Sequence, residues 1–391
     1  MNWIVTVNTL LIVLLVGAMF YAMPLLTRPT IPLGVSIPST RVNEPVVTTA
    51  VKRYRIGIIA VTLGAGLLAI IAAALPPLPA TLLPVVVVLV GTLVVYLASR
   101  RIIQQAKRDG DWYRDVPVRL TATISAAERP RIAPALGWYL AGLIVLMAAI
   151  VIGAAVYDSL PNPVPVHWNA DGVADRFAPK GIWSVFGPIL LGVGTVALLY
   201  LLAALIPRWP ARAVASDTPE VSARVAVAQL TLLQGLLGQV AFFIALEFAC
   251  VSFVGWLAAG SPTGILLTTL VLPVLLLGLV ALFVARYRRA TVVARSGVPV
   301  TSGGVGGAAR PTAEAPDDDR YWKAGSLYVN RADPALIVPK RFGVGWTVNL
   351  GHPAGIALAV ITLLVVVGAI VFGIATGSHG HALGAFGGLD R

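Results

Sequence analysis

Three side chains of metal-ligating type stand four residues apart in the one compact polar block between two long apolar runs. They are His167, Asp171 and Asp175, and the block at 160–180 has the sequence LPNPVPVHWNADGVADRFAPK. On a helix, residues spaced by four share one face. An imidazole and two carboxylates on one face could hold Zn²⁺ or Mn²⁺. The spacing therefore indicates metal binding as one candidate chemistry for this block.

The residues between these side chains favour a turn instead. Asn169, Asp171 and Gly172 give the segment a turn composition, so the helical spacing does not apply. In this interpretation Asn169 and Asp171 satisfy backbone amides of the turn, and His167 packs beside Trp168. We therefore predict no metal ion and no other cofactor at this block.

Signatures of common hydrolases and nucleotide-binding proteins do not occur in the sequence. There is no HExxH, no GxSxG and no P-loop. A hydrolase would have to combine His167 with Asp158, Asp171 or Asp175, and nothing in their spacing demands it. The single cysteine, Cys250, lies in an apolar run and has no nearby histidine. We predict a protein that is not an enzyme, and keep a metal-dependent envelope enzyme around His167 as an alternative.

A second set of polar residues lies inside an apolar run. Glu247 is the only acidic residue within any predicted membrane span, and Gln239, Phe243 and Glu247 share one helical face. That face should point into a helical bundle, because an ionised carboxylate is costly in lipid. Two interpretations stay open: a proton or cation site of a secondary transporter formed by Glu247 with Gln239, or a carboxyl with a structural role.

Membrane-spanning helices must position both sets of polar residues, the block at 160–180 and the face that carries Glu247. The 391-residue chain is 58% hydrophobic and 12% charged, with a mean hydropathy of +0.86, whereas a soluble domain carries roughly 25% charged residues. A run of about 20 apolar residues crosses a bilayer. Eight such runs occur: Ile4–Leu26, Ile56–Leu75, Leu82–Ala98, Trp138–Tyr157, Trp183–Ile206, Leu230–Ala259, Ile265–Ala285 and Ile356–Ala375. The predicted fold is an all-α integral membrane bundle of about eight transmembrane helices, with a small cytoplasmic element before the last span.

The net charge of +12 follows membrane topology rather than nucleic-acid binding. Four segments, 27–55, 99–135, 207–226 and 286–350, hold 26 of the 29 Lys and Arg residues. With eight spans and both termini outside, all four segments face the cytoplasm, as the positive-inside rule requires. We therefore predict a multi-pass plasma-membrane protein whose partner is the lipid bilayer and which makes no direct contact with nucleic acid.

The polar segments divide the chain into six predicted regions. They are a three-span region with basic cytoplasmic loops at 1–135, a two-span unit carrying the outer loop 158–182 at 136–206, a two-span unit with Glu247 at 207–290, a flexible linker at 291–320, a small cytoplasmic domain at 321–351, and the last span with an outer tail at 352–391. Within the first region, we expect the segment at 27–55 to be an extended loop that lies along the membrane.

The polar block resembles a short domain of unknown function in a bacterial family of polytopic membrane proteins. This family includes the immunity protein against the sporulation-delaying-protein toxin and its relatives. The matching residues are Leu160, Pro161, Pro163, Pro165, His167, Asn169, Gly172, Asp175 and Lys180. The segment 321–351 resembles a second, cytoplasmic domain of unknown function, through runs such as PKRFG at 339–343 and GWT at 345–347. The resemblance implies protection from a membrane-active peptide and sequestration of a repressor at the membrane.

The predicted function is protection against, or sensing of, an envelope-active peptide toxin or another envelope signal outside, with control of a cytoplasmic regulator. Pro161, Pro163 and Pro165 should hold the start of the block extended, and a stiff loop presents its side chains with little ordering cost. The predicted recognition residues are His167, Trp168, Asn169, Asp171, Asp175 and Arg176. A secondary transporter that uses Glu247 is the alternative.

Overall fold

The computed structural model describes residues 3–114, 116, 132–168, 174–205, 219–257, 262–296, 317–364 and 367. Within this part of the chain, seven helices are long and apolar enough to cross a membrane. They are α1 (Trp3–Leu26), α2 (Pro45–Ile71), α3 (Pro77–Asp109), α4 (Leu136–Val156), α5 (Ile182–Leu205), α6 (Pro219–Leu257) and α7 (Pro262–Ser296). The chain is an all-helical bundle of the multi-pass membrane type, which confirms the predicted fold class.

Prolines mark where four of these helices begin, at Pro45, Pro77, Pro219 and Pro262. Proline suits the first helical position because its ring fixes a helical φ and its missing N–H would find no partner there. These starts lie before the apolar runs that predicted the spans, so the polar residues at the helix ends are helical too. The segment 27–55, expected to be an extended loop, is therefore helical from Pro45 onward.

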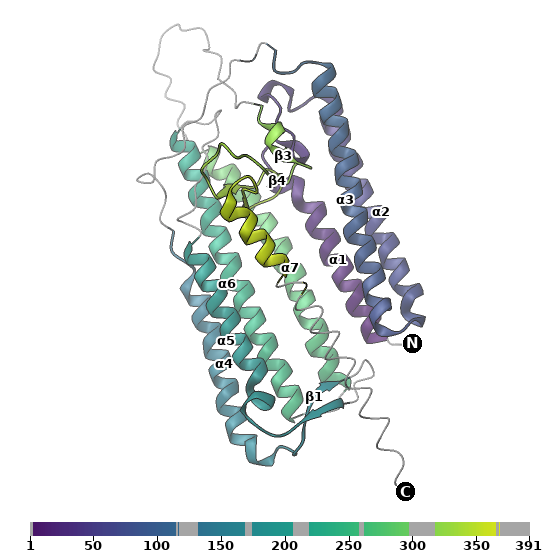
Figure 1. Ribbon diagram of the computed structural model, residues 1–391, viewed down its shortest axis with the longest axis vertical. Helices are drawn as coiled ribbons and strands as arrows, with labels where there is room; N and C mark the ends of the chain where they lie inside the picture. Colours follow the sequence, from purple (N-terminus) through teal and green to yellow (C-terminus); the bar gives the residue numbers. More distant parts are fainter. Residues whose placement is uncertain are drawn as a thin grey trace.

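The helices form two groups that α7 joins (Figure 1). One group is α1, α2 and α3; in the other, α4 and α5 both pack against α6; and α7 contacts α6 and α1. The centre of the second group consists of small residues, since Ala241, Ala245 and Ala249 of α6 are fully buried. A Cβ placed on Gly142 of α4 would lie 3.2 Å from the Cβ of Ala245, and small residues of this kind let helices approach closely. The predicted boundary between 136–206 and 207–290 does not separate two packing units.

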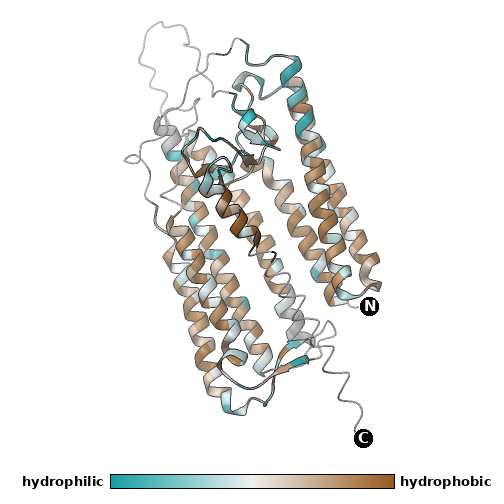
Figure 2. Cartoon of the chain, viewed as in Figure 1, coloured by the Kyte–Doolittle hydropathy of each residue, from teal (hydrophilic) through white to brown (hydrophobic). Residues whose placement is uncertain are grey.

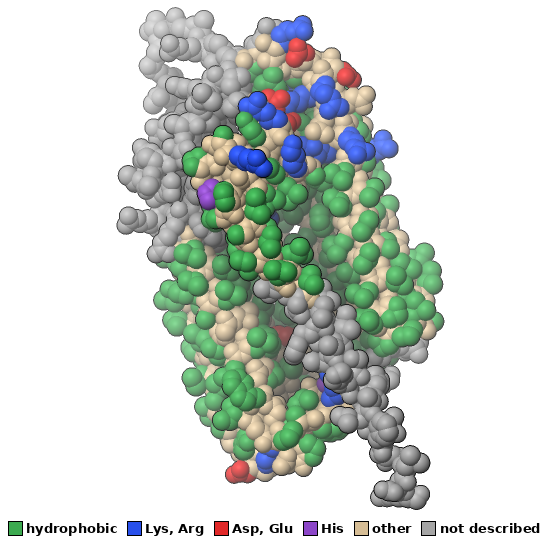
Figure 3. All heavy atoms as spheres, viewed as in Figure 1, with side chains coloured by type: hydrophobic (Ala, Val, Ile, Leu, Met, Phe, Trp, Pro, Cys, Tyr) green, Lys and Arg blue, Asp and Glu red, His purple; other side chains and the backbone are tan. Residues whose placement is uncertain are grey.

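Polar and apolar side chains are sorted along the bundle. Figure 2 shows apolar residues along the length of the helices, and Figure 3 shows Lys and Arg gathered at one end. We call this the basic end, where α3 ends and α2 begins, and we call the opposite end, which carries the connection between α4 and α5, the hairpin end (Figure 1). Large apolar side chains between the two ends are exposed, among them Leu63 at 69% and Ile144 at 68%. Such residues cost nothing when they face lipid.

Residues 317–351 form a small element at the basic end, which we call the basic-end element. It consists of η7 (Asp319–Tyr321) and two short hairpins, β3 (Trp322–Lys323) with β4 (Leu327–Tyr328) and β5 (Ile337–Pro339) with β6 (Trp346–Val348). Phe342 stacks on Tyr96 of α3 with 4.7 Å between ring centroids. Leu33, Val35 and Ile37, from the loop before α2, are buried in the same core. This loop is therefore a buried layer and not the membrane-hugging segment expected, because its apolar side chains have an aromatic core to pack on.

The last predicted span, 356–375, is described only in part. An apolar helix covers Pro353–Leu364, and the remainder of the span lies outside the described residues apart from 367. The outer tail after it and most of the predicted linker at 291–320 also lie outside the described ranges. At the two edges of that linker, α7 continues to Ser296 and the basic-end element begins at 317.

Candidate functional site

The polar block at 160–180 folds as an antiparallel hairpin between α4 and α5 (Figure 1). Strand β1 (Val164–Trp168) pairs with β2 (Ala174–Ala178). The register is irregular, with shifts between Pro165 and His167 and between His167 and Trp168. A bulge of this kind changes the direction of the side chains around it. Residues 169–173, which include the predicted recognition residues Asn169 and Asp171, lie outside the described residues.

Lys180 fastens the hairpin to the end of α4. Its ammonium donates hydrogen bonds to the carbonyl oxygens of Tyr157 at 3.3 Å, Asp158 at 3.4 Å and Leu160 at 3.1 Å, and it lies 5.3 Å from the centre of the Tyr157 ring. Its backbone N–H donates to Oδ1 of Asn162 at 3.0 Å. Carbonyls at a helix end lack intrahelical partners, and a lysine there satisfies them and complements the helix dipole. One side chain thus joins the start of the hairpin to its end.

Ser184 then organises the entry into α5. Its hydroxyl donates to the carbonyl oxygen of Pro179 at 2.8 Å and accepts from the backbone N–H of Gly181 at 3.0 Å. These bonds turn the chain from β2 into the helix, and they place the Ser184 side chain beside the space beneath the hairpin.

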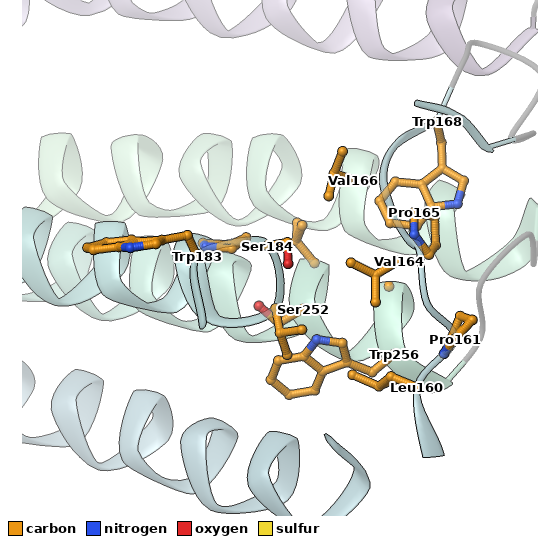
Figure 4. A pocket seen from close by; sticks show the side chains of 14 residues that line it. Leu160, Pro161, Val164, Pro165, Val166, Trp168, Trp183, Ser184, Ser252 and Trp256 are labelled. Atoms are coloured by element: carbon orange, nitrogen blue, oxygen red, sulfur yellow. The ribbon is translucent and has the colours of Figure 1, made fainter. Parts of the chain in front are cut away.

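A cavity of about 290 Å³ lies between the hairpin, α5 and α6 (Figure 4). Its walls are mostly apolar: Leu160, Pro161, Val164, Pro165, Val166, Trp168, Trp183, Val185, Pro188, Val251, Gly255 and Trp256. The hydroxyls of Ser184 and Ser252 are the polar side chains of its described lining. A concave, mainly apolar space with a few polar groups is typical of a small binding site. We call it the hairpin cavity.

Trp168 faces this cavity, although it was predicted among the side chains that the loop presents to a ligand outside. Its ring covers α6 at Gly255, where an added Cβ would lie 3.2 Å from the indole. The indole Nε1 is buried and has no hydrogen-bond partner in the described part of the chain. The indole N–H can only donate, so it could serve a ligand oxygen inside the cavity. Trp168 shares this face of β1 with Val164 and Val166, which line the same cavity.

His167 and Asp175 come together across the hairpin. Nδ1 of His167 lies 2.5 Å from Oδ1 of Asp175, and the two side chains are 44% and 41% exposed. Arg176 is the strand partner of His167, so these three predicted recognition residues lie side by side on the hairpin. Among the described residues, no three His, Cys, Asp or Glu side chains gather as metal ligands would. The candidate set of metal ligands also includes Asp171, which lies outside the described residues.

Glu247 lines a separate cavity of about 210 Å³ between α6 and α7. Phe243 and Cys250 line it as well, but Gln239 does not. Of the two polar residues, Gln239 and Glu247, only Glu247 therefore lines this cavity. Because Ser252 and Gly255 of α6 face the hairpin cavity, one stretch of α6 separates the two cavities.

Two contributors from α6 were not predicted from the sequence. Ser252 is 4% exposed, and its hydroxyl donates to the carbonyl oxygen of Phe248 at 2.9 Å. Trp256, four residues later and so on the same helical face, packs with Leu160 and Val164. In the sequence, Ser252 and Trp256 stand four residues apart within an apolar run, which places them on one helical face. Only the fold shows that this face packs against the hairpin.

Two segments of the chain match models of protein families. Residues 144–193 match a domain of unknown function (DUF1648), and residues 331–356 match a family of unknown function (DUF5808). The first match covers the hairpin with parts of α4 and α5, and the second covers much of the basic-end element. No curated protein matches the chain, and no solved structure does. The chain thus carries two domains of unknown function, one at each end of the bundle.

Proposed function

We propose that this multi-pass membrane protein acts in immunity or envelope sensing, and that the hairpin cavity binds an apolar side chain of an envelope-active peptide. The observation that carries the proposal is the cavity of about 290 Å³ beneath a hairpin whose surface carries the pair of His167 and Asp175, with side chains that are 44% and 41% exposed. Apolar space for the anchoring side chain is combined with polar groups at its edge, as in interfaces built around a buried hot spot.

The sorting of charge supports an outward-facing hairpin. Lys and Arg gather at the opposite end of the bundle (Figure 3), and cytoplasmic loops carry the excess of basic residues in membrane proteins. On this basis the hairpin and the start of α1 face outside, while the basic-end element faces the cytoplasm of the cell. A peptide that arrives from outside would then meet the hairpin before the bilayer core.

The aromatic side chains around the cavity support a peptide as the ligand. Trp183 is 79% exposed, so its ring is available to an arriving chain, and Trp168 offers an indole N–H within the same cavity. Aromatic residues bury large contact areas at low entropic cost and dominate binding energy. The hairpin is fastened by Lys180 at both its ends, which lowers the ordering cost of binding. No step of this function requires catalysis, a metal ion or a cofactor.

The basic-end element is the proposed contact for a cytoplasmic regulator. Lys323, Leu327 and Lys340 are exposed on it, and the element is held against α3 by Phe342. A signal from the hairpin cavity would have to travel through α6 and α7 to reach it, since these helices connect the hairpin side with α1.

A binding experiment with the full chain in lipid nanodiscs tests the proposal. The probe is a dye-labelled amphipathic Lys/Leu peptide, and its affinity is compared for the wild type, Trp168→Ala and Phe177→Ala. Phe177 is 56% exposed and does not line the cavity, which makes it the matched aromatic control. Losing a buried aromatic anchor costs at least about 2 kcal/mol, or roughly thirtyfold in affinity. We expect this loss for Trp168→Ala only, at unchanged membrane abundance. Equal binding by both variants would contradict the proposal.

One observation favours a second candidate, a secondary transporter: Glu247 lines a cavity within the membrane-spanning part of α6. A carboxyl in such a position is a default candidate for a proton or cation site. Glu247→Gln separates the two functions because the amide keeps the size and loses the charge. Peptide binding unaffected by Glu247→Gln fits the recognition proposal. A proton flux in proteoliposomes that the same substitution abolishes would establish transport instead.

A further inference from the structure

Two hollows follow the seam between α1 and α7, away from both cavities described above. The first has a volume of about 490 Å³ and is lined by α1, α2 and α7. Its lining is apolar along its length, apart from Tyr21 and Thr62. The second has a volume of about 160 Å³, lies at the basic end, and includes Arg28 and Arg288 in its lining. We call the first the seam groove and the second the seam mouth.

The groove and the mouth are continuous along both helices. They share Leu25 of α1. On α7 the groove is lined by Leu277, Val280, Ala281 and Val284, and the mouth is lined by Tyr287, Arg288, Thr291 and Val292. Positions that recur every three or four residues form a single stripe on a helix. The α7 face that lines the apolar groove therefore runs on directly into the cationic mouth.

The charged residues in the described lining of the mouth are Arg28 and Arg288, and both are cationic. No acidic side chain is among the described residues that line either hollow. A third cation, Arg55, lies with its guanidinium carbon 5.6 Å from the centre of the ring of Tyr21, which lines the groove. Nε of Arg55 is buried and has no hydrogen-bond partner within the described part of the chain. The mouth is thus suited to an anion, for which arginine offers forked donors.

The length of the groove matches a lipid chain. The rise along α1 from Leu14, which lines the groove, to Leu26, which lines the mouth, is about 18 Å at about 1.5 Å per residue. One leaflet of a bilayer has a hydrocarbon thickness of about 15 Å, half of the whole core. An acyl chain in the groove would therefore place its headgroup at the level of Arg28 and Arg288. Exposed residues of the groove, such as Leu63 and Leu14, open it to the surrounding lipid.

We propose that the seam between α1 and α7 is a specific site for one anionic phospholipid. The phosphate of the headgroup binds at Arg28 and Arg288, and one acyl chain lies along the seam groove. The lipid fills the space between the two helical groups, which meet chiefly where α1 contacts α7. This site is independent of the hairpin cavity and of the proposed recognition of a peptide.

The test uses the full chain, delipidated in a mild detergent and titrated with phosphatidylglycerol, phosphatidylcholine or inorganic phosphate. Bound lipid is counted by native mass spectrometry, and the melting temperature is followed in parallel. For the wild type we expect one retained phosphatidylglycerol, at least about tenfold preferred over phosphatidylcholine, and no stabilisation by phosphate alone. Equal retention of both lipids would mean ordinary annular lipid, and stabilisation by phosphate alone would mean a soluble-anion site. Each result would overturn the proposal.

Two pairs of variants locate the site. The double variant Arg28→Gln/Arg288→Gln should lose about tenfold in phosphatidylglycerol affinity, whereas Arg286→Gln, which lies outside both linings, should keep it. Ala281→Trp fills the groove and should weaken binding of either lipid, whereas Ala285→Trp, outside the lining, should not. Variants are compared only as monodisperse protein with a cooperative melt. No difference between the members of each pair would overturn the proposal.

A photo-crosslinking residue in place of Leu63 distinguishes other occupants of the groove. Cross-links to phosphatidylglycerol in native membranes support the proposal. Cross-links to residues 365–391 would show that the chain's own C-terminal segment fills the groove, and cross-links to a second copy would show a dimer interface. Either result would overturn it.

Discussion

Asn349 has both polar atoms of its side chain bonded in the interior of the basic-end element. It is 0% exposed. Its Oδ1 accepts from the backbone N–H groups of Asn330 at 3.0 Å and Gly351 at 2.9 Å. Its Nδ2 donates to the carbonyl oxygens of Asn330, Asp333 and Ala335, at 2.9, 3.1 and 3.2 Å. One side chain thus replaces the strand pairing that this irregular segment lacks.

Asn349→Ala should therefore loosen the basic-end element. Each buried polar group left without a partner costs about 1–3 kcal/mol, so we expect a loss of at least about 3 kcal/mol and rapid cleavage within 321–351 by proteinase K. Asn349→Asp should behave similarly, because a carboxylate would face three carbonyl oxygens. Lys323→Ala, at an exposed position, is the control. Identical cleavage of Asn349→Ala and the control would refute the role given to Asn349.

Trp168 shows why a residue can be identified from the sequence while its direction is not. Alternation along a regular strand would place Trp168 and Val166 on one face and His167 on the other. Val164, Val166 and Trp168 do line the hairpin cavity and His167 does not, so this alternation holds despite the register shifts on either side of His167. Which of the two strand faces covers α5 and α6 depends on packing between segments far apart in the sequence, and no local pattern reveals it.

At the scale of elements, the acidic run 317–319 joins the basic-end element to α3. Lys107 pairs with Asp317 at 2.7 Å and with Asp319 at 2.8 Å, and Arg341 pairs with Asp318 and Asp319. Oδ1 of Asp319 also accepts from the backbone N–H of Ser36 at 3.0 Å. This run lies at the end of the predicted flexible linker, 291–320. The run is instead ordered because Lys107 and Arg341 are nearly buried and need anionic partners.

Asp319→Asn and Asp317→Asn should differ in their effects. The side chain of Asp319 is 15% exposed and that of Asp317 is 40% exposed. Removing one partner of a buried ion pair costs about 3–5 kcal/mol, whereas an exposed pair contributes about 0–1 kcal/mol. We expect Asp319→Asn to lower the melting temperature and to raise amide hydrogen exchange across 319–351, with little change for Asp317→Asn. Equal exchange in the two variants would show that burial does not govern this contact.

At the scale of the whole molecule, the distribution of charge gives the proposed orientation in the membrane. A single cysteine at Asp158, exposed at the hairpin end, should react with a membrane-impermeant maleimide on intact cells. A single cysteine at Lys323, exposed on the basic-end element, should react only after lysis. Both variants are made in a Cys250→Ala background. The reverse pattern would invert the proposed sidedness and remove the outward-facing hairpin from the proposed function.

The sequence by itself determined the membrane class, the position of seven long helices and the polar block between α4 and α5. These features depend on local composition: an apolar run long enough for a bilayer becomes a helix because lipid leaves the backbone no other partners. The pairing of His167 with Asp175 was also within reach, since both lie in one short hairpin.

Only the tertiary structure decided which faces meet. It placed Ser252 and Trp256 of α6 beneath the hairpin, placed Glu247 in the lining of a cavity with α7, and brought Lys107 to Asp319 across more than half of the chain. In an all-round apolar helix no stripe distinguishes the buried face from the lipid face. The partners of each helix are therefore set by close contacts of small residues and by a few polar bonds, and these depend on residues far apart in the sequence.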